Sequence, residues 1–145
     1  MEGTRGLLRA AVITLTEYFQ GRDRAYPEEL TDQIRAAASE TVAKANLLIS
    51  AYRARTNDQE PRRVTSGWRT PAINQATPGA APRSRHMTGQ AIDISDPEGD
   101  LDEWCMDNPA VLQTIGLWLE HPACTKGWTH LQVVPPKSGK RVFWP

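Results

Sequence analysis

The sequence Ser84-Arg-His-Met-Thr-Gly-Gln-Ala-Ile-Asp-Ile-Ser95 combines a strand pattern with polar side chains suited to metal or proton chemistry. Side chains alternate between the two faces of a strand, so Asp93 points away from the face shared by Ile92 and Ile94. We therefore expect the two isoleucines to enter the core while the carboxylate faces a cleft.

Two histidines can join this carboxylate. Gly89 permits a tight turn that brings His86 back toward the strand. In Gly127-Trp-Thr-His-Leu-Gln132 the same alternation places His130 on the face opposite Leu131. Two imidazoles and one carboxylate can hold a zinc ion and leave a fourth position for water, as catalytic zinc sites do. The competing interpretation is that each histidine is an ordinary hydrogen-bonded residue.

Around these segments the pattern predicts an α+β fold, with a small antiparallel sheet and helices packed against it. Ten of the eleven prolines and all five tryptophans follow residue 60, which favours a helical first part and a remainder of loops and strands. The predicted strands are Arg63–Ser66, Gln90–Ser95, Thr129–Val134 and a possible return strand, Arg141–Trp144.

Three helices are predicted from apolar residues at helical spacing. The longest runs from about Pro27 to Arg55. The second begins at Asp100, where Asp-Leu-Asp-Glu is typical of a capping box with Asp100 as the cap and Glu103 reaching back. It should break at Asn108-Pro109. The third covers Ala110 to Glu120.

Length and charge limit the classes of protein. The chain has 145 residues, and 17 Lys and Arg balance 17 Asp and Glu. We expect a single domain over 1–145, with a helical part at 1–60 and a metal-site part at 61–145. Neither half of the chain is basic enough to indicate nucleic acid as a partner. Cys105 and Cys124 have no metal-binding spacing and no evident disulfide framework, so they are expected to be buried small side chains or free thiols.

The apolar stretch Leu7–Leu15 is the only candidate near the start for a targeting or membrane segment. It is short, contains Arg9 and Thr14, and lacks a small-residue cleavage site. We therefore expect neither a signal peptide nor a membrane partner.

The first segment fits the pattern SxHxxGxAxD and, with the later W-x-H, resembles the zinc peptidases that include D-Ala-D-Ala carboxypeptidases, D-Ala-D-Ala dipeptidases and phage L-alanyl-D-glutamate endolysins. Upstream, Ser66-Gly-Trp-Arg-Thr-Pro71 is similar to the family's SGYR(S/T)P element. The phrases around Tyr18-Phe19 and Val142-Phe143-Trp144 resemble those of phage-encoded members. The resemblance spans nearly the whole chain and implies a Hedgehog/D-Ala-D-Ala peptidase-like fold.

The resemblance also implies roles for individual residues. Zinc would be held by His86, Asp93 and His130. Arg69 would stabilise developing negative charge or grip a substrate carboxylate, and Ser84 would contact the substrate peptide. Independently of the family, a guanidinium offers several fixed donors suited to a carboxylate or an oxyanion. A solvated loop arginine is the alternative.

The general base departs from the family pattern. Well-studied relatives carry Glu or Asp three or four residues before the last His ligand, but here Lys126 and Gly127 occupy those positions. Glu120, at the end of the third predicted helix, would reach the site if the connection after it folds back. A solvated helix-end glutamate is the competing interpretation. The other candidates are His121 and the acidic run Asp96–Asp107.

The resulting hypothesis is a zinc-dependent peptidoglycan peptidase, a carboxypeptidase or endopeptidase that hydrolyses an amide bond in stem or cross-link peptides. We expect a monomeric, phage-type cell-wall lytic enzyme, made in a bacterial cytoplasm and acting on the wall, or carried with a virion. Two alternatives stay open. One is a zinc-bearing binding module without turnover, as in the related Hedgehog signalling domain, which the missing base motif favours. The other is a virion structural component.

Overall fold

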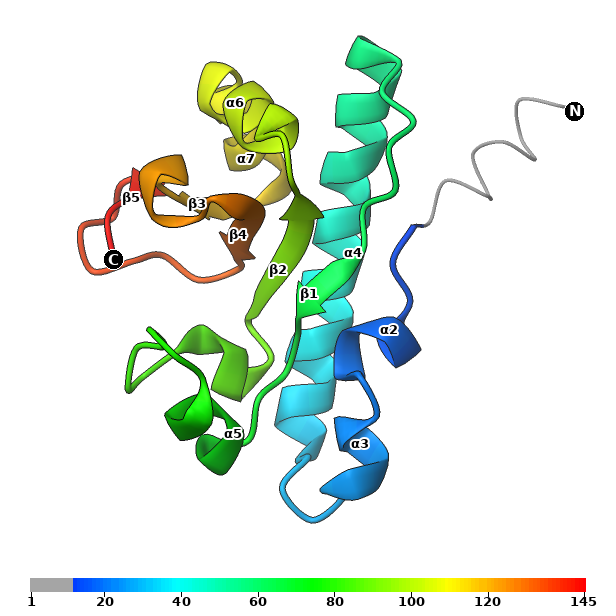
Figure 1. Ribbon diagram of the computed structural model, residues 1–145, viewed down its shortest axis with the longest axis vertical. Coiled ribbons are helices and arrows are strands. Elements are labelled where there is room, and N and C mark those ends of the chain that lie inside the picture. Colours follow the sequence, from blue (N-terminus) through cyan, green and yellow to red (C-terminus); the bar gives the residue numbers. More distant parts are fainter. Residues whose placement is uncertain (1–11) are drawn as a thin grey trace, which may run out of the picture.

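The computed structural model describes residues 12–145, so most of the Leu7–Leu15 stretch and the first residues of the predicted helical part lie outside it. Its sheet has five strands in the order β1-β2-β4-β3-β5, with the long helix α4 lying along β2 (Figure 1). The predicted α+β fold with a small antiparallel sheet is confirmed. Within the described residues, no helix has the length and apolar character needed to cross a membrane.

The sheet has five strands, of which all but the third lie within one or two residues of a predicted range; the third was not predicted as a strand. They are β1 (Val64–Ser66), β2 (Ala91–Asp96), β3 (Trp118–Glu120), β4 (Gly127–Gln132) and β5 (Val142–Phe143). All neighbouring pairs are antiparallel except one. β5 runs parallel to β3 at the edge of the sheet, so it is not the second strand of a hairpin.

The register between β2 and β4 builds the centre of the molecule. Asp93 lies opposite His130, and Ile92 lies opposite Leu131. Ile92, Ile94 and Leu131 are fully buried in the core. The predicted alternation is confirmed, because the apolar face of each strand packs inward and the polar face turns to the other side.

Helices cover the apolar face and the ends of the sheet. They are α2 (Leu15–Phe19), α3 (Arg22–Ala25), α4 (Asp32–Thr56), α5 (Pro71–Ala76), α6 (Asp100–Asp107) and α7 (Pro109–Ile115), with 3-10 turns η1 (Arg85–Thr88) and η2 (Pro122–Cys124). The stripe of α4 that enters the core is formed by Ala38, Thr41, Val42, Ala45, Leu48, Ile49 and Tyr52.

One helix start and one helix cap differ from the prediction, while α6 begins at Asp100 as predicted. α4 begins at Asp32 rather than near Pro27, because the Thr31 hydroxyl accepts from the Ile34 N–H and caps the helix there. The capping box at Asp100 is wrong. Gly99 occupies the cap position without a side-chain bond, and the carboxylate of Asp96 accepts from the first-turn N–H groups instead.

The third predicted helix, Ala110–Glu120, is wrong in its second half. α7 ends where Gly116 adopts a left-handed conformation with φ 92°. The chain then becomes β3, so Trp118 and Leu119 belong to the sheet and not to a helix stripe. The predicted break at Asn108-Pro109 is confirmed, since α6 ends at Asp107 and α7 begins at Pro109.

Candidate active site

A cleft of about 530 Å³ opens over the polar face of β2 and β4. One wall is the segment that leads into η1, and another is formed by β3 and β5. Its lining residues include every site residue that the sequence analysis selected: Arg69, Ser84, His86, Asp93, Glu120 and His130. The fold therefore gathers residues separated by up to 61 positions along the chain.

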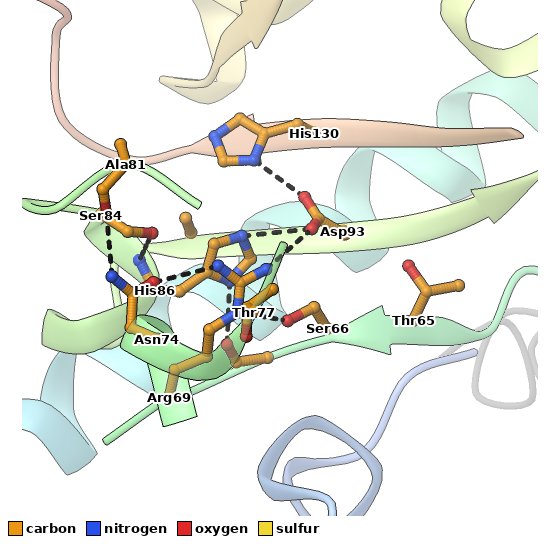
Figure 2. Close-up of polar contacts among 12 residues, drawn as sticks. Thr65, Ser66, Arg69, Asn74, Thr77, Ala81, Ser84, His86, Asp93 and His130 are labelled. Carbon is orange, nitrogen blue, oxygen red and sulfur yellow. Dashed lines mark hydrogen bonds and ion pairs between the residues drawn. The ribbon is translucent and has the colours of Figure 1, made fainter. Parts of the chain in front are cut away.

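His86, Asp93 and His130 form one buried cluster (Figure 2). The Asp93 carboxylate lies between the two rings, with Oδ1 2.8 Å from His130 Nδ1 and Oδ2 3.3 Å from His86 Nε2. One candidate ligand atom from each residue lies within 4.8 Å of the others. Such a set of two imidazoles and one carboxylate fits a zinc ion.

Hydrogen bonds fix which nitrogen of His86 is free. Nδ1 lies 2.8 Å from the carbonyl oxygen of Gly67, which can only accept, so Nδ1 carries the proton. The Nε2 lone pair of the neutral ring then faces Asp93. This arrangement is typical of metal-ligating histidines, whose second nitrogen donates to a carbonyl or carboxylate.

The electrostatics of the cluster favour a charged carboxylate. Burial alone would raise the pKa of Asp93, but the charges and hydrogen bonds of His86 and His130 outweigh it and lower that pKa. Burial also opposes the charged form of His130, yet the hydrogen bond to Asp93 and its charge raise the pKa of His130. The carboxylate is therefore an anionic group available to a cation.

Arg69 is buried beside this cluster and is not a solvated loop residue. Its Nε donates to Ser66 Oγ over 2.9 Å, and one terminal nitrogen donates to Asn74 Oδ1 over 3.2 Å. The other terminal nitrogen lies 3.6 Å from Asp93 Oδ2. Asn74 is itself held by the carbonyl of Ala81, so the guanidinium has a fixed orientation (Figure 2).

Ser84 stands at the start of η1, half-buried in the cleft wall. Its Oγ accepts from the backbone N–H of His86 over 3.2 Å and so caps the turn. The hydroxyl hydrogen has no partner in that bond and can be donated to a ligand.

Glu120 lies on β3 and not at the end of a helix, which corrects the sequence prediction. Leu119 pairs with Leu131, and continuing this antiparallel register sets Glu120 beside His130. η2 provides the fold-back between the two strands. The side chain is half-buried in the cleft. Burial raises the pKa of Glu120; the charge of His130 opposes this shift, and that of Asp93 adds to it.

Comparison with protein families identifies the chain. The family model described as Peptidase M15 matches residues 23–131, which contain the whole cluster together with Arg69, Ser84 and Glu120. The chain belongs to the peptidase M15 family. Membership indicates a metallopeptidase with a peptide substrate. Searches of curated proteins and of solved structures gave no match.

The other candidate bases of this M15 chain lie elsewhere. His121 accepts from Ala123 N–H and stacks on Trp144, with ring centroids 3.9 Å apart. It lines a second cavity, of about 470 Å³, which is separate from the cleft in its lining residues. In the acidic run, Asp96 is buried in an ion pair with Arg62, and Asp102 lines the second cavity.

Three residues that support the cluster or Arg69 were not predicted from the sequence: Gly67, Asn74 and Gln132. Gly67 acts through its carbonyl and Asn74 through Arg69, so neither side-chain chemistry nor spacing signals them. Gln132 had a signal, because it shares a strand face with His130. Of the two tryptophans near the motifs, Trp68 is a packing residue at 1% exposure, whereas Trp128 lines the cleft. The two cysteines are free.

Proposed function

We propose that this chain is a zinc metallopeptidase that hydrolyses an amide bond in the stem or cross-link peptides of bacterial peptidoglycan. The observation that carries the proposal is the convergence of His86, Asp93 and His130 in a cleft that also contains Arg69 and Glu120. Family membership supports a peptidase, and the resemblance to wall-acting zinc peptidases supports the substrate.

The zinc ion would be held by Nε2 of His86, the carboxylate of Asp93 and Nδ1 of His130. Bound there, it would supply Lewis acidity, polarising the scissile carbonyl and lowering the pKa of a water. The remaining steps fall to side chains of the protein, which must bind the peptide, move a proton and receive the negative charge of the tetrahedral state.

Glu120 is proposed as the group that moves the proton. Its carboxylate accepts a proton from the attacking water and can return it to the leaving amine. Partial burial raises its pKa, which makes it a better base than an exposed glutamate and a competent acid in the second step. The strand position beside His130 compensates for the absence of a carboxylate at Lys126 and Gly127.

Arg69 is proposed to bind the oxyanion or a substrate carboxylate. Ser66 and Asn74 hold two of its nitrogens, so little reorganisation is needed when negative charge develops. Ser84, on the wall of the cleft, is proposed to donate to the substrate backbone. Peptidoglycan stem peptides carry free carboxylates, which match a fixed guanidinium.

The biological setting is proposed from the resemblance to phage-encoded members. A lytic enzyme made in a bacterial cytoplasm and released onto the wall would use this site, and so would a virion-associated enzyme that opens the wall on entry. Both settings require hydrolysis of wall peptides by a single zinc-loaded domain spanning the chain, and we propose that it acts as a monomer.

The proposal predicts one zinc per chain and release of new amino groups from purified peptidoglycan. His86→Ala and His130→Ala should each lose most of the zinc and the activity, while His121→Ala, outside the cleft, should keep both. Elemental analysis and mass spectrometry of the fragments measure the two properties. Full zinc retention in both ligand variants would refute the site. Zinc binding without any wall cleavage would favour the binding module.

A further inference from the structure

We infer that Gln132 is a positioning residue that fixes the tautomer of His130 and so presents Nδ1 to the metal. This inference rests on the proposed zinc site. The three residues involved occupy alternate positions at the end of β4 and just beyond it: His130, Gln132 and Val134. The hydrogen bonds between them have only one consistent direction.

The carbonyl group of Val134 sets the donor and acceptor direction of these hydrogen bonds. The carbonyl oxygen of Val134 can only accept, and it lies 2.9 Å from Gln132 Nε2, so the amide nitrogen must face it. The amide oxygen is then the atom 3.2 Å from His130 Nε2. Because an amide oxygen only accepts, His130 must carry a hydrogen on Nε2. Nδ1, which lies 2.8 Å from Asp93 Oδ1, is then the ring nitrogen that can give up its hydrogen and present a lone pair to the metal.

Burial and pairing keep this arrangement in place. Gln132 is 6% exposed, so bulk water does not compete freely for its amide. Its backbone pairs with Ala91 on one side and with Trp118 on the other, which fixes the strand under it. His86 has a backbone carbonyl in the equivalent role. Gln132 is therefore the partner that a side-chain substitution can remove.

Loss of the amide should weaken metal binding. Without an acceptor for Nε2–H, the neutral ring of His130 is free to carry its hydrogen on Nδ1 and to donate it to Asp93 Oδ1, 2.8 Å away. That tautomer has no lone pair for the metal at Nδ1. Removal of partners that orient a ligand typically costs about 10- to 100-fold in metal affinity.

The test compares zinc affinity by chelator competition in full-length protein. Gln132→Leu should bind zinc about 10- to 100-fold more weakly than wild type. Gln132→Glu keeps an acceptor for Nε2–H but loses the donor to the Val134 carbonyl, so it should bind zinc more tightly than Gln132→Leu, and the exposed Gln113→Leu should be unchanged from wild type. Equal affinity of Gln132→Leu and wild type would overturn the inference.

Nitrogen-15 spectra of the imidazoles give a readout that needs no variant to fold. In zinc-loaded wild type, His130 should show a slowly exchanging hydrogen on Nε2, and in Gln132→Leu that hydrogen should exchange faster. A His130 ring with the hydrogen on Nδ1 in the zinc-loaded wild type would overturn the inference even if all variants misfold. Absence of zinc binding by wild type would instead refute the proposed function.

Discussion

Arg69 shows how a buried charge can be held ready for a ligand. Burial lowers the pKa of its guanidinium, and the nearby Asp93 opposes that effect. Ser66 and Asn74 accept hydrogen bonds from two of its nitrogens, and the third nitrogen lies 3.6 Å from Asp93 Oδ2, beyond hydrogen-bond distance, where Arg69 lines the cleft. A lysine has no such planar fork, so its single ammonium cannot reproduce these contacts.

Replacing Arg69 should therefore affect turnover more than metal binding. We expect Arg69→Ala to keep its zinc and to lose roughly 10²-fold or more in kcat, the scale seen when an oxyanion donor is removed. Arg69→Lys should recover only part of this loss. Steady-state kinetics on a peptide fragment, with zinc content as the control, measure both. Wild-type kcat in a folded Arg69→Ala protein would contradict the assignment.

Glu120 gives a prediction with a defined pH dependence. A base must be deprotonated, so wild-type activity should fall as the pH drops through the raised pKa of this carboxyl. Glu120→Gln should keep the fold and the zinc, lose about 10²–10⁴-fold in rate and lose that acidic limb. The pH–rate profiles of the two proteins are the measurement. An unchanged acidic limb in the variant would move the base to another group.

At the scale of elements, the turn between β1 and α5 ties the helical part to the site. The carbonyl of Gly67 holds His86, while its Cα packs against the backbone of Tyr18 in α2. A Cβ at this glycine would lie 1.9 Å from the Tyr18 carbonyl oxygen, closer than any real contact. No side chain fits unless α2 or the turn moves.

Gly67→Ala should thus be destabilising and should also displace His86. We expect a loss of about 1–3 kcal/mol in the free energy of unfolding, as for an overpacked core, together with weaker zinc binding. Gly79→Ala is the control, because a Cβ there meets nothing within 4 Å and has only the strain of φ +76°. Denaturant unfolding and chelator competition give the two quantities. A smaller loss in Gly67→Ala than in Gly79→Ala would contradict the steric argument.

At the scale of the whole molecule, a second polar network joins α6 to the sheet. Asp96 on β2 pairs with Arg62 and accepts from the backbone of α6. Asp102 on α6 accepts from Thr125 through one oxygen, while its other oxygen has no partner among the described residues. Burial, and then the charge of Asp96, raise the pKa of Asp102 to about 7, although the Thr125 hydrogen bond opposes the shift.

This carboxyl makes folding stability depend on pH. Its folded-state pKa lies above the unfolded value of about 3.9, so its stabilising contribution is fully present below about pH 4 and is lost as the pH rises toward 7. Asp102→Asn cannot ionise. We therefore expect the Tm of wild type, relative to Asp102→Asn, to fall between pH 4 and 7.5. A Tm difference between wild type and Asp102→Asn that stays constant over this pH range would contradict the shift.

Part of the architecture followed from local patterns. Period-two alternation around Asp93 and His130 was sufficient to predict that both lie on strands and face away from the core. A strand with one buried face requires this alternation. The helix at α4 followed from its apolar spacing, although its first residue depended on the Thr31 cap. The segment Trp118–Glu120 was mistaken for helix because short apolar runs suit either structure, and only pairing with β4 and β5 made it a strand.

The sequence by itself determined the cluster's ligand types, the alternation that turns them into one cleft, and the family to which the chain belongs. The tertiary structure decided what surrounds them: Gly67 and Gln132 as hydrogen-bond partners of the histidines, Asn74 as the support of Arg69, and Glu120 beside His130. The physical reason is that residue type and strand period are local properties. Hydrogen-bond partners and cross-strand neighbours come from distant segments, and only the packed sheet brings them within reach.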